Sequence, residues 1–401
     1  MFQHLQTKPT DALLGLMVAF RNDPRASKID VGVGVYRDEQ GNTPVMKAVK
    51  EAETRLLATQ QSKTYVGMIG DAHYNAAMQA MVAGPMVEPL GGRLRSVQTA
   101  GGCAALRALA DLIAFTRPEA TVWLSDPTWI NHGPLIGAAR LKLDKYPYFD
   151  VKRQAVAFDA MMACLKERGP NDVVLLHGAC HNPTGADLTS DQWQQIAELA
   201  VERGFLPFID LAYQGLGRGV DHDADAVRIL AAKVPEMLVA VSCSKSFGIY
   251  RERVGSAMVI GANDSAAQNM LDHVLTLIRG SYSMPPDHGA NAVQLVLTTP
   301  ELKKMWFDEL EGMRVRIAEL RTALSNEFRS VTETPKYDYI AKQYGMFSLL
   351  ALTPVQVDQL RETFGIYMPS DGRTNIAGLN TSQIKPFVRA VVEVTGVKVA
   401  A

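Results

Sequence analysis

Cysteine is scarce in this chain, and its placement excludes several kinds of site. The 401 residues include four cysteines, Cys103, Cys164, Cys180 and Cys243. They form neither a CxxC pair nor a Cys/His set with the spacing of a zinc site. Scattered cysteines of this kind are typical of reduced thiols. We therefore expect a cytoplasmic protein without a bound metal.

Long apolar runs and an excess of charge of one sign are also missing. No apolar stretch approaches the length that crosses a bilayer, and the first residues lack the basic head and cleavage site of a signal peptide. The formal net charge is -1. This balance argues against a surface for nucleic acid or anionic membranes, but a few local arginines could still bind acidic substrates.

Short apolar runs alternate with helical patterns through the middle of the chain. One helical pattern begins after Gly101 and ends near Arg117, and another opens with Thr189 and Gln192 as a capping box. Such alternation predicts an α/β protein with a mostly parallel sheet covered on both faces. Pro207 is a misfit, because proline removes a hydrogen bond from a central strand. The predicted strands are 121–124, 173–176, 205–209 and 237–241.

Polar residues follow each of these runs, and Asp126, His177, Asp210 and Lys245 are among them. In open α/β sheets the ligand site lies beyond the carboxyl ends of the strands. We therefore expect the four run ends to converge on one crevice.

A long helical pattern over 300–331 separates this region from a smaller unit near the C-terminus. That unit should contain a strand over 347–352, a helix after Thr353 and a helix over 382–394. We predict an N-terminal arm and part of the small domain over 1–43, a large domain over 44–312 and a small C-terminal domain over 313–401.

Lys245 lies in the motif Ser-Cys-Ser-Lys-Ser-Phe-Gly-Ile-Tyr-Arg-Glu-Arg-Val-Gly, directly after a predicted strand. A lysine in a partly desolvated pocket has a lowered pKa, so its neutral amine can form a Schiff base. Arg253 and the nearby hydroxyls suit a phosphate. This combination favours pyridoxal phosphate, whereas an isolated lysine at a strand end would simply point into solvent.

Other candidates each have a plainer interpretation. Asp210 could pair with a protonated pyridine nitrogen or cap a turn. Trp129 could stack on a ring or pack in the core. The segment 177–185 could suggest a metal, but it lacks partner ligands elsewhere. Arg279 and Arg373 could grip a dicarboxylate or face solvent.

Taken together, these motifs resemble the class I pyridoxal phosphate-dependent aminotransferases, in the aspartate and aromatic amino acid branch. The likeness extends from Gly32-Val33-Gly34-Val35-Tyr36 to Arg373. It implies fold type I, with a large domain built on a mostly parallel sheet and a smaller α+β domain that closes over substrate. It also implies a homodimer with shared active sites.

The resemblance assigns roles around the cofactor ring. Lys245 would be the Schiff-base lysine and proton shuttle, and Asp210 would pair with the pyridine nitrogen. Asn182 and Tyr213 would hydrogen-bond the ring oxygen. Trp129 would stack on the ring and, like Asn182, contact the substrate. His132 and His177 would support Asp210.

It also implies a phosphate site made of Gly102, Cys103, Ser242, Ser244 and Arg253. Cys103 departs from the family pattern, which has Ser or Thr there, and a thiol is a weak donor. We therefore expect looser phosphate binding at this position.

Substrate binding follows from the same resemblance. Tyr65 would reach the phosphate of the neighbouring subunit, and Arg279 would reach a substrate's distal carboxylate from the other subunit. Arg373 would bind the α-carboxylate, and Gly34 would lie beside the substrate.

The expected reaction is ping-pong transfer of an amino group from an aromatic or dicarboxylic L-amino acid to 2-oxoglutarate. The apolar Met284 favours aromatic substrates alongside dicarboxylates. An aspartate-specific aminotransferase is the alternative, and a β-lyase or decarboxylase could share the fold. A regulatory pyridoxal phosphate-sensing domain would need a DNA-binding domain ahead of it, and the resemblance begins near residue 30.

Overall fold

The computed structural model describes residues 2–7 and 12–397, which form two compact units. The larger unit contains residues 44–182 and 186–316, and the smaller one contains the described residues of 1–43, 183–185 and 317–401. The predicted domain boundaries lie after residues 43 and 312. None of the helices in the described ranges is both long enough and apolar enough to cross a membrane.

The larger unit is built on a seven-stranded sheet with the order β2-β10-β9-β8-β7-β3-β4. All neighbours are parallel except at β10, which runs antiparallel to both β2 and β9. The α/β class and the mostly parallel sheet are therefore confirmed. The strands are β2 Leu94–Thr99, β3 Thr121–Asp126, β4 Lys142–Pro147, β7 Asp172–His177, β8 Leu206–Leu211, β9 Met237–Ser242 and β10 Gly255–Ile260, with a separate hairpin of β5 Phe149–Asp150 and β6 Ala155–Val156.

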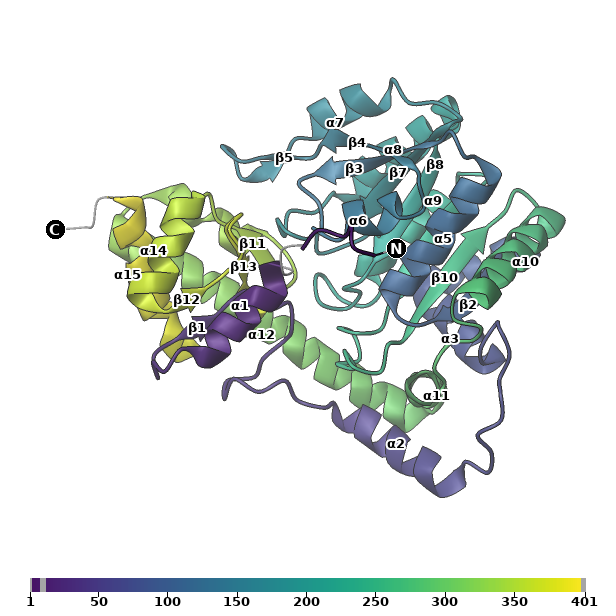
Figure 1. The fold of residues 1–401 in the computed structure, drawn as a ribbon, viewed down its shortest axis with the longest axis horizontal. Helices are drawn as coiled ribbons and strands as arrows, with labels where there is room; N and C mark the ends of the chain where they lie inside the picture. Colours follow the sequence, from purple (N-terminus) through teal and green to yellow (C-terminus); the bar gives the residue numbers. More distant parts are fainter. Residues whose placement is uncertain (1, 8–11, 398–401) are drawn as a thin grey trace. The chain divides into compact units, whose positions relative to one another are not determined.

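Helices cover both faces of this sheet (Figure 1). The helices α5, α6 and α10 pack on one face, and α3, α8 and α9 lie on the other. The helices of this unit are α2 Lys47–Thr59, α3 Ala72–Ala83, α4 Val87–Leu90, α5 Gly102–Thr116, α6 His132–Gly137, α7 Phe158–Leu165, α8 Ser190–Arg203, α9 Asp225–Ala231, α10 Asp264–Ser281 and α11 His288–Thr298.

Local sequence explains several of these boundaries. Thr189 and Gln192 form the expected capping box of α8, and Gly204 ends that helix in the left-handed conformation. Pro207 does lie in β8, but the ladder between β8 and β9 begins one residue later, at Phe208. Pro207 is the second residue of β8 and is paired with Val174 of β7, so its missing N–H falls near the amino end of the strand, where few ladder hydrogen bonds are affected.

The smaller unit joins N-terminal and C-terminal segments. Strand β1 (Ile29–Asp30) pairs in parallel with β12 (Ile366–Tyr367). Strand β11 (Phe347–Leu349) is shorter than the predicted 347–352, because its partner β13 (Arg373–Asn375) offers three residues for pairing. The helices are α1 Ala12–Asn22, α13 Tyr339–Lys342, α14 Pro354–Phe364 and α15 Ile384–Thr395, and α12 Pro300–Thr332 belongs to both units.

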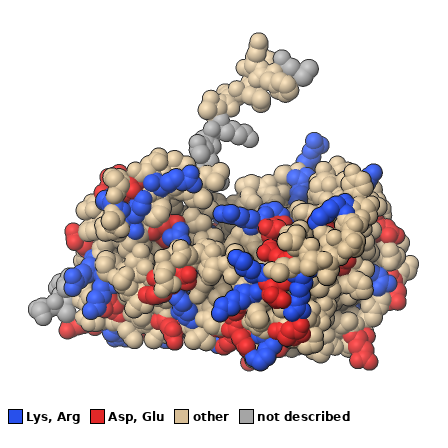
Figure 2. Space-filling model, turned by 90° about the horizontal axis from the view of Figure 1, so that it is seen from below, with Lys and Arg blue, Asp and Glu red and all other residues tan. Residues whose placement is uncertain are grey.

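The chain's charges are mixed rather than segregated. On the face drawn in Figure 2, lysine and arginine side chains lie among aspartate and glutamate side chains. This arrangement agrees with the formal net charge of -1.

Candidate functional site

The carboxyl ends of β2, β3, β7, β8 and β9 open on one edge of the sheet, because these strands are mutually parallel. The antiparallel β10 brings its amino end to the same edge, since Gly255 is paired with both Ser242 and Thr99. Arg253 therefore reaches this edge from the segment just before its strand. The strand ends were predicted to converge on one crevice, and this strand order does bring them to the same edge of the sheet.

Lys245 lies three residues beyond the end of β9. Its Nζ lies over the ring of Tyr213, 4.9 Å from the ring centroid. The Ser244 backbone N–H donates to Ser242 Oγ at 3.3 Å, which helps to shape the turn between the strand and the lysine.

Asp210 lies near the end of β8 and is 7% exposed. His132 Nε2 lies 2.9 Å from Asp210 Oδ2. Burial alone would raise the pKa of Asp210, but the hydrogen bond from His132 and the positive charge of Lys245 help to hold this pKa below its usual value. The carboxylate therefore stays ionised and can hold a cationic partner.

Thr128 joins the two histidines behind Asp210. Its Oγ1 lies 2.7 Å from His132 Nδ1 and 3.1 Å from His177 Nε2. Burial lowers the pKa of His177 to about 3, so this imidazole is neutral at pH 7. The Thr128 hydroxyl can donate one hydrogen bond and accept another, so it links both imidazoles in a chain of hydrogen bonds that ends at the Asp210 carboxylate.

A second layer lies behind these residues. Ser125 Oγ is 3.0 Å from His181 Nε2, and the ring of Tyr148 stacks on His181 with centroids 4.0 Å apart. Burial lowers the pKa of His181 well below its usual value, so it too is neutral. Within residues 2–7 and 12–397, no group of three or more His, Cys, Asp or Glu side chains could hold a metal ion. In this chain His132 and His181 make hydrogen bonds, and His181 also stacks on Tyr148.

The sequence prediction gave Thr128 and Tyr148 no role. It placed Ser125 only among the polar residues at the strand ends and His181 only in the segment considered for a metal. A hydroxyl or ring in a supporting layer leaves no spacing pattern. The polar residues after β3 were the only signal that could have indicated Thr128.

Asn182 and Tyr213, which follow β7 and β8, lie in contact with each other. Asn182 Nδ2 donates to the Tyr213 hydroxyl at 3.2 Å, and both side chains are buried. Trp129 lies edge-on to His132, with ring centroids 5.3 Å apart. The indole is thus held against the imidazole that contacts Asp210.

A glycine turn between β2 and α5 lies against the segment around β9. Gly101 has φ of 84°, and a Cβ there would lie 2.6 Å from a guanidinium nitrogen of Arg253. A Cβ at Gly102 would lie 2.9 Å from Ser242 Cβ. Arg253 Nη1 donates to Ser244 Oγ at 3.4 Å. A cationic group, hydroxyls and the N-terminus of α5 therefore meet where only glycine fits, which suits an anion such as phosphate.

Cys103 is the second residue of α5. Burial raises the pKa of its thiol, although the positive charges of Arg253 and Lys245 act in the opposite direction. The thiol is therefore neutral at pH 7 and remains a weak donor.

Two predicted substrate residues lie in the smaller unit. Arg373 is buried, donates from Nη2 to the Gly32 carbonyl at 2.7 Å and lies over the ring of Phe347. A Cβ at Gly34 would lie 3.0 Å from Phe347 Cζ. Phe347 is therefore a common neighbour of both residues.

Two further predicted residues are exposed in the larger unit. Tyr65 is 88% exposed. Arg279 lies near the end of α10 and donates to Ser283 Oγ. Neither joins the group of residues around Lys245 within this chain, and the prediction placed both in the site of a neighbouring subunit.

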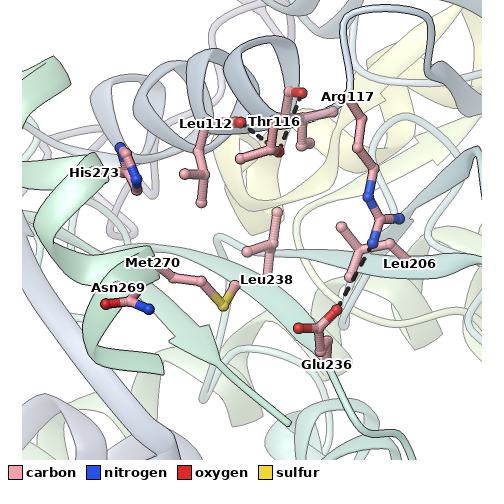
Figure 3. Close-up of a pocket in the computed structure, with 10 residues that line it drawn as sticks. Leu112, Thr116, Arg117, Leu206, Glu236, Leu238, Asn269, Met270 and His273 are labelled. Carbon is pink, nitrogen blue, oxygen red and sulfur yellow. Dashed lines mark hydrogen bonds and ion pairs between the residues drawn. The ribbon is translucent and has the colours of Figure 1, made fainter. Parts of the chain in front are cut away.

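A separate cavity of about 220 Å³ lies at the opposite edge of the sheet (Figure 3). Leu206 and Leu238, near the amino ends of β8 and β9, form part of its wall, and Arg117 lies 3.8 Å from Glu236 beside it. It holds none of the predicted site residues. The candidate site is therefore the edge that carries Lys245.

Comparison with known proteins agrees with this geometry. Residues 26–391 match the family model of aminotransferase class I and II. The chain is 44% identical to the aromatic-amino-acid aminotransferase of Paracoccus denitrificans, over 98% of this chain and 100% of that protein. It is 42% identical to the aspartate aminotransferase of Salmonella typhi, again over 98% and 100%.

A solved structure supports the same relationship. The aromatic-amino-acid aminotransferase of Burkholderia pseudomallei, covalently bound to pyridoxal phosphate, is 40% identical and superimposes with a TM-score of 0.95, covering 99% of this chain and 100% of that one. Family model, sequence relatives and fold agree over nearly the whole length. This chain belongs to the class I and II aminotransferases.

Proposed function

We propose that this protein is a pyridoxal phosphate-dependent aminotransferase that moves an amino group from aromatic or dicarboxylic L-amino acids to 2-oxoglutarate. The observation that carries the proposal is the buried, ionised Asp210 at the same sheet edge as Lys245. One group is a carboxylate that suits a protonated pyridine nitrogen, and the other is an amine that suits an aldehyde.

The residues at this edge fit each part of the cofactor. The turn at Gly101 and Gly102 lies against Ser242 and Arg253, and together with Ser244 these residues offer donors for a phosphate. When bound, pyridoxal phosphate supplies an aldehyde for an amino group and a ring that accepts electrons released at the substrate's α-carbon.

The chain's own groups divide the remaining work. Lys245 Nζ would take the α-proton from the amino acid and deliver it to the carbon that carried the cofactor's aldehyde, and it would run the same transfers in reverse when 2-oxoglutarate reacts. Asp210, fixed by His132, would hold a positive charge at the ring nitrogen. Asn182 and Tyr213 would bind the ring oxygen, and Trp129 would cover the ring. Arg373 would bind the substrate α-carboxylate through its guanidinium fork, with Gly34 leaving room for the substrate.

Two measurements test the assignment directly. The purified holoenzyme should show a visible absorption band that changes when an amino acid is added and is restored by 2-oxoglutarate. Borohydride reduction followed by peptide mapping should place the cofactor on Lys245. A modified peptide elsewhere, or none, would refute the mechanism. Release of an oxo acid, rather than an amine or pyruvate plus ammonia, separates transamination from decarboxylation and β-elimination.

The names of the relatives support a dual substrate range, because both aromatic-amino-acid and aspartate aminotransferases match over nearly the full chain. The half-buried, apolar Met284 follows the turn after α10 and suits an aromatic side chain. An aspartate-specific enzyme is the alternative. Steady-state kinetics with tyrosine, phenylalanine and aspartate decide between them, since negligible turnover of both aromatic substrates would contradict the dual range.

We expect Arg279→Leu to lower kcat/KM for aspartate far more than for phenylalanine. The guanidinium would pair with the distal carboxylate, a charge-assisted contact that phenylalanine cannot make. A loss of about 100-fold for aspartate, with less than about 3-fold for phenylalanine, is the expected pattern. Arg107→Leu, which removes an arginine of α5 that pairs with Asp111 on the same helix, is the control. Equal losses for both substrates would contradict the assigned role.

We further propose a homodimer, acting in the cytoplasm, in which Tyr65 and Arg279 serve the neighbouring subunit. The Tyr65 side chain is 88% exposed in the single chain, which suits burial in a subunit interface. Light scattering should give twice the mass of one chain. Mixed dimers of Lys245→Ala and Arg279→Leu chains should recover aspartate activity by restoring one complete site.

The compartment is supported by a separate observation. None of the four cysteines, all within the described ranges, forms a disulfide, which suits a reducing compartment.

We expect Cys103→Ser to tighten cofactor binding. A serine hydroxyl at the start of α5 donates a stronger hydrogen bond to a phosphate oxygen than the neutral thiol. The dissociation constant for pyridoxal phosphate should fall by about 3- to 10-fold, measured by dialysis or fluorescence titration. Cys164→Ser, on α7, is the matched control. Unchanged retention would mean that the other donors suffice.

A further inference from the structure

The turn that carries Lys245 has a contact outside its own loop. Trp306 lies in the first half of α12 and is 2% exposed. Its indole Nε1 donates to the backbone carbonyl of Ser246 at 2.8 Å, in a buried position. The bonded carbonyl belongs to the residue that directly follows the lysine.

The same indole also holds the next residue. The rings of Phe247 and Trp306 are stacked, with centroids 4.9 Å apart and planes 10° apart. Phe247 is fully buried. One side chain of α12 thus contacts two successive residues of the lysine turn, one by a hydrogen bond and one by ring stacking.

The turn's own backbone bonds leave a place for this donor. The Phe247 N–H donates to the Cys243 carbonyl at 3.2 Å, and the Gly248 N–H donates to the Lys245 carbonyl at 3.2 Å. Neither of these two bonds uses the Ser246 carbonyl, which accepts the hydrogen bond from the indole. A buried carbonyl left without a donor is unfavourable, so loss of the Trp306 indole is expected to destabilise this turn.

We propose that Trp306 is a positioning residue for Lys245. It fixes the backbone on the carboxyl side of the lysine, while β9 fixes the amino side, and together they set the direction in which the lysine side chain leaves the backbone. Loosening one side allows the amine to take several positions, which weakens its alignment with the α-proton. This inference rests on the role proposed for Lys245, which the borohydride mapping tests separately.

The experiment compares buried tryptophans in the holoenzyme. Trp306→Phe keeps an aromatic ring and removes the N–H. Trp193→Phe, on α8, is the control for loss of a buried indole. Trp123→Phe is the control for loss of an indole hydrogen bond, since Trp123 Nε1 donates to Asp172 Oδ1 at 2.8 Å. The readouts are the pH midpoint of the visible absorption change, kcat and KM, and the melting temperature.

Trp306→Phe should move the spectral midpoint by about 0.5 to 1 pH unit, the size expected from one lost neutral hydrogen bond. It should lower kcat by about 10-fold and change KM by less than about 2-fold. The controls should lose melting temperature while they keep the midpoint and kcat. A midpoint and kcat in Trp306→Phe that match the controls would overturn the proposal, since the indole would then act only in packing.

Phe247→Leu is the second variant, because it removes the stacked ring and keeps the indole donor. It should move the midpoint in the same direction by a smaller amount. It also decides the question if Trp306→Phe does not fold. No shift in Phe247→Leu would then count against the proposal.

Discussion

Lys245→Ala is expected to lower kcat by about 10⁴-fold, because it removes both the amine that binds the cofactor and the group that moves the α-proton. The surrounding fold should be unaffected, since the side chain follows the end of β9 and takes no part in the sheet ladder. Turnover by coupled assay and peptide mapping after borohydride reduction measure the two losses separately.

Lys142→Ala is the matched control for this variant. Lys142 lies in β4, and its side chain is 63% exposed and pairs with Glu119. Its removal should leave kcat within about 2-fold, because an exposed ion pair contributes little. A Lys245→Ala protein with more than about a tenth of the wild-type rate would require another group to act as the base, and the mechanism would fail.

Asp210→Asn should lower kcat by about 10²- to 10³-fold and weaken retention of the cofactor. The amide can still contact His132, so the local structure should persist. It lacks the negative charge that keeps a pyridine nitrogen protonated, so the ring accepts electrons less well. The visible spectrum, rapid-reaction kinetics of the first half-reaction and dialysis against buffer measure these effects.

The control is Asp172→Asn, which removes a carboxylate at the opposite edge of the same sheet, where the amino ends of the parallel strands lie. Asp172 is the first residue of β7 and accepts the indole N–H of Trp123. Asp172→Asn can cost stability but should leave the spectrum and kcat unchanged. If Asp210→Asn behaved in the same way, the carboxylate would not act on the cofactor.

The strands that carry the site could be predicted from sequence because they are buried on both faces. Strand β9 is an unbroken buried run, and β7 is nearly so. Strand β4, in contrast, is mostly polar and exposed at the edge of the sheet, so an apolar-run criterion does not find it. The antiparallel direction of β10 depends on pairing between distant segments, which no local pattern reveals.

The site residues also fall into those that sequence motifs indicate and those that only the structure reveals. Lys245, Asp210 and Asn182 lie in motifs whose residue types match a chemical task. Thr128 and Trp306 act through geometry, since one bridges two imidazoles and the other bonds a backbone carbonyl. Such roles depend on distances between elements, and only a structure supplies those distances.

Strand β10 pairs with β2 and β9, and so connects a late part of the chain to an early one. The glycine turn before α5 lies against Arg253, which directly precedes β10, so the two meet once this interior strand is in place. Pairings between remote segments are slow steps in folding. A refolding chain should therefore gain secondary structure well before it captures its cofactor, and cofactor uptake should report completion of the sheet rather than initial collapse.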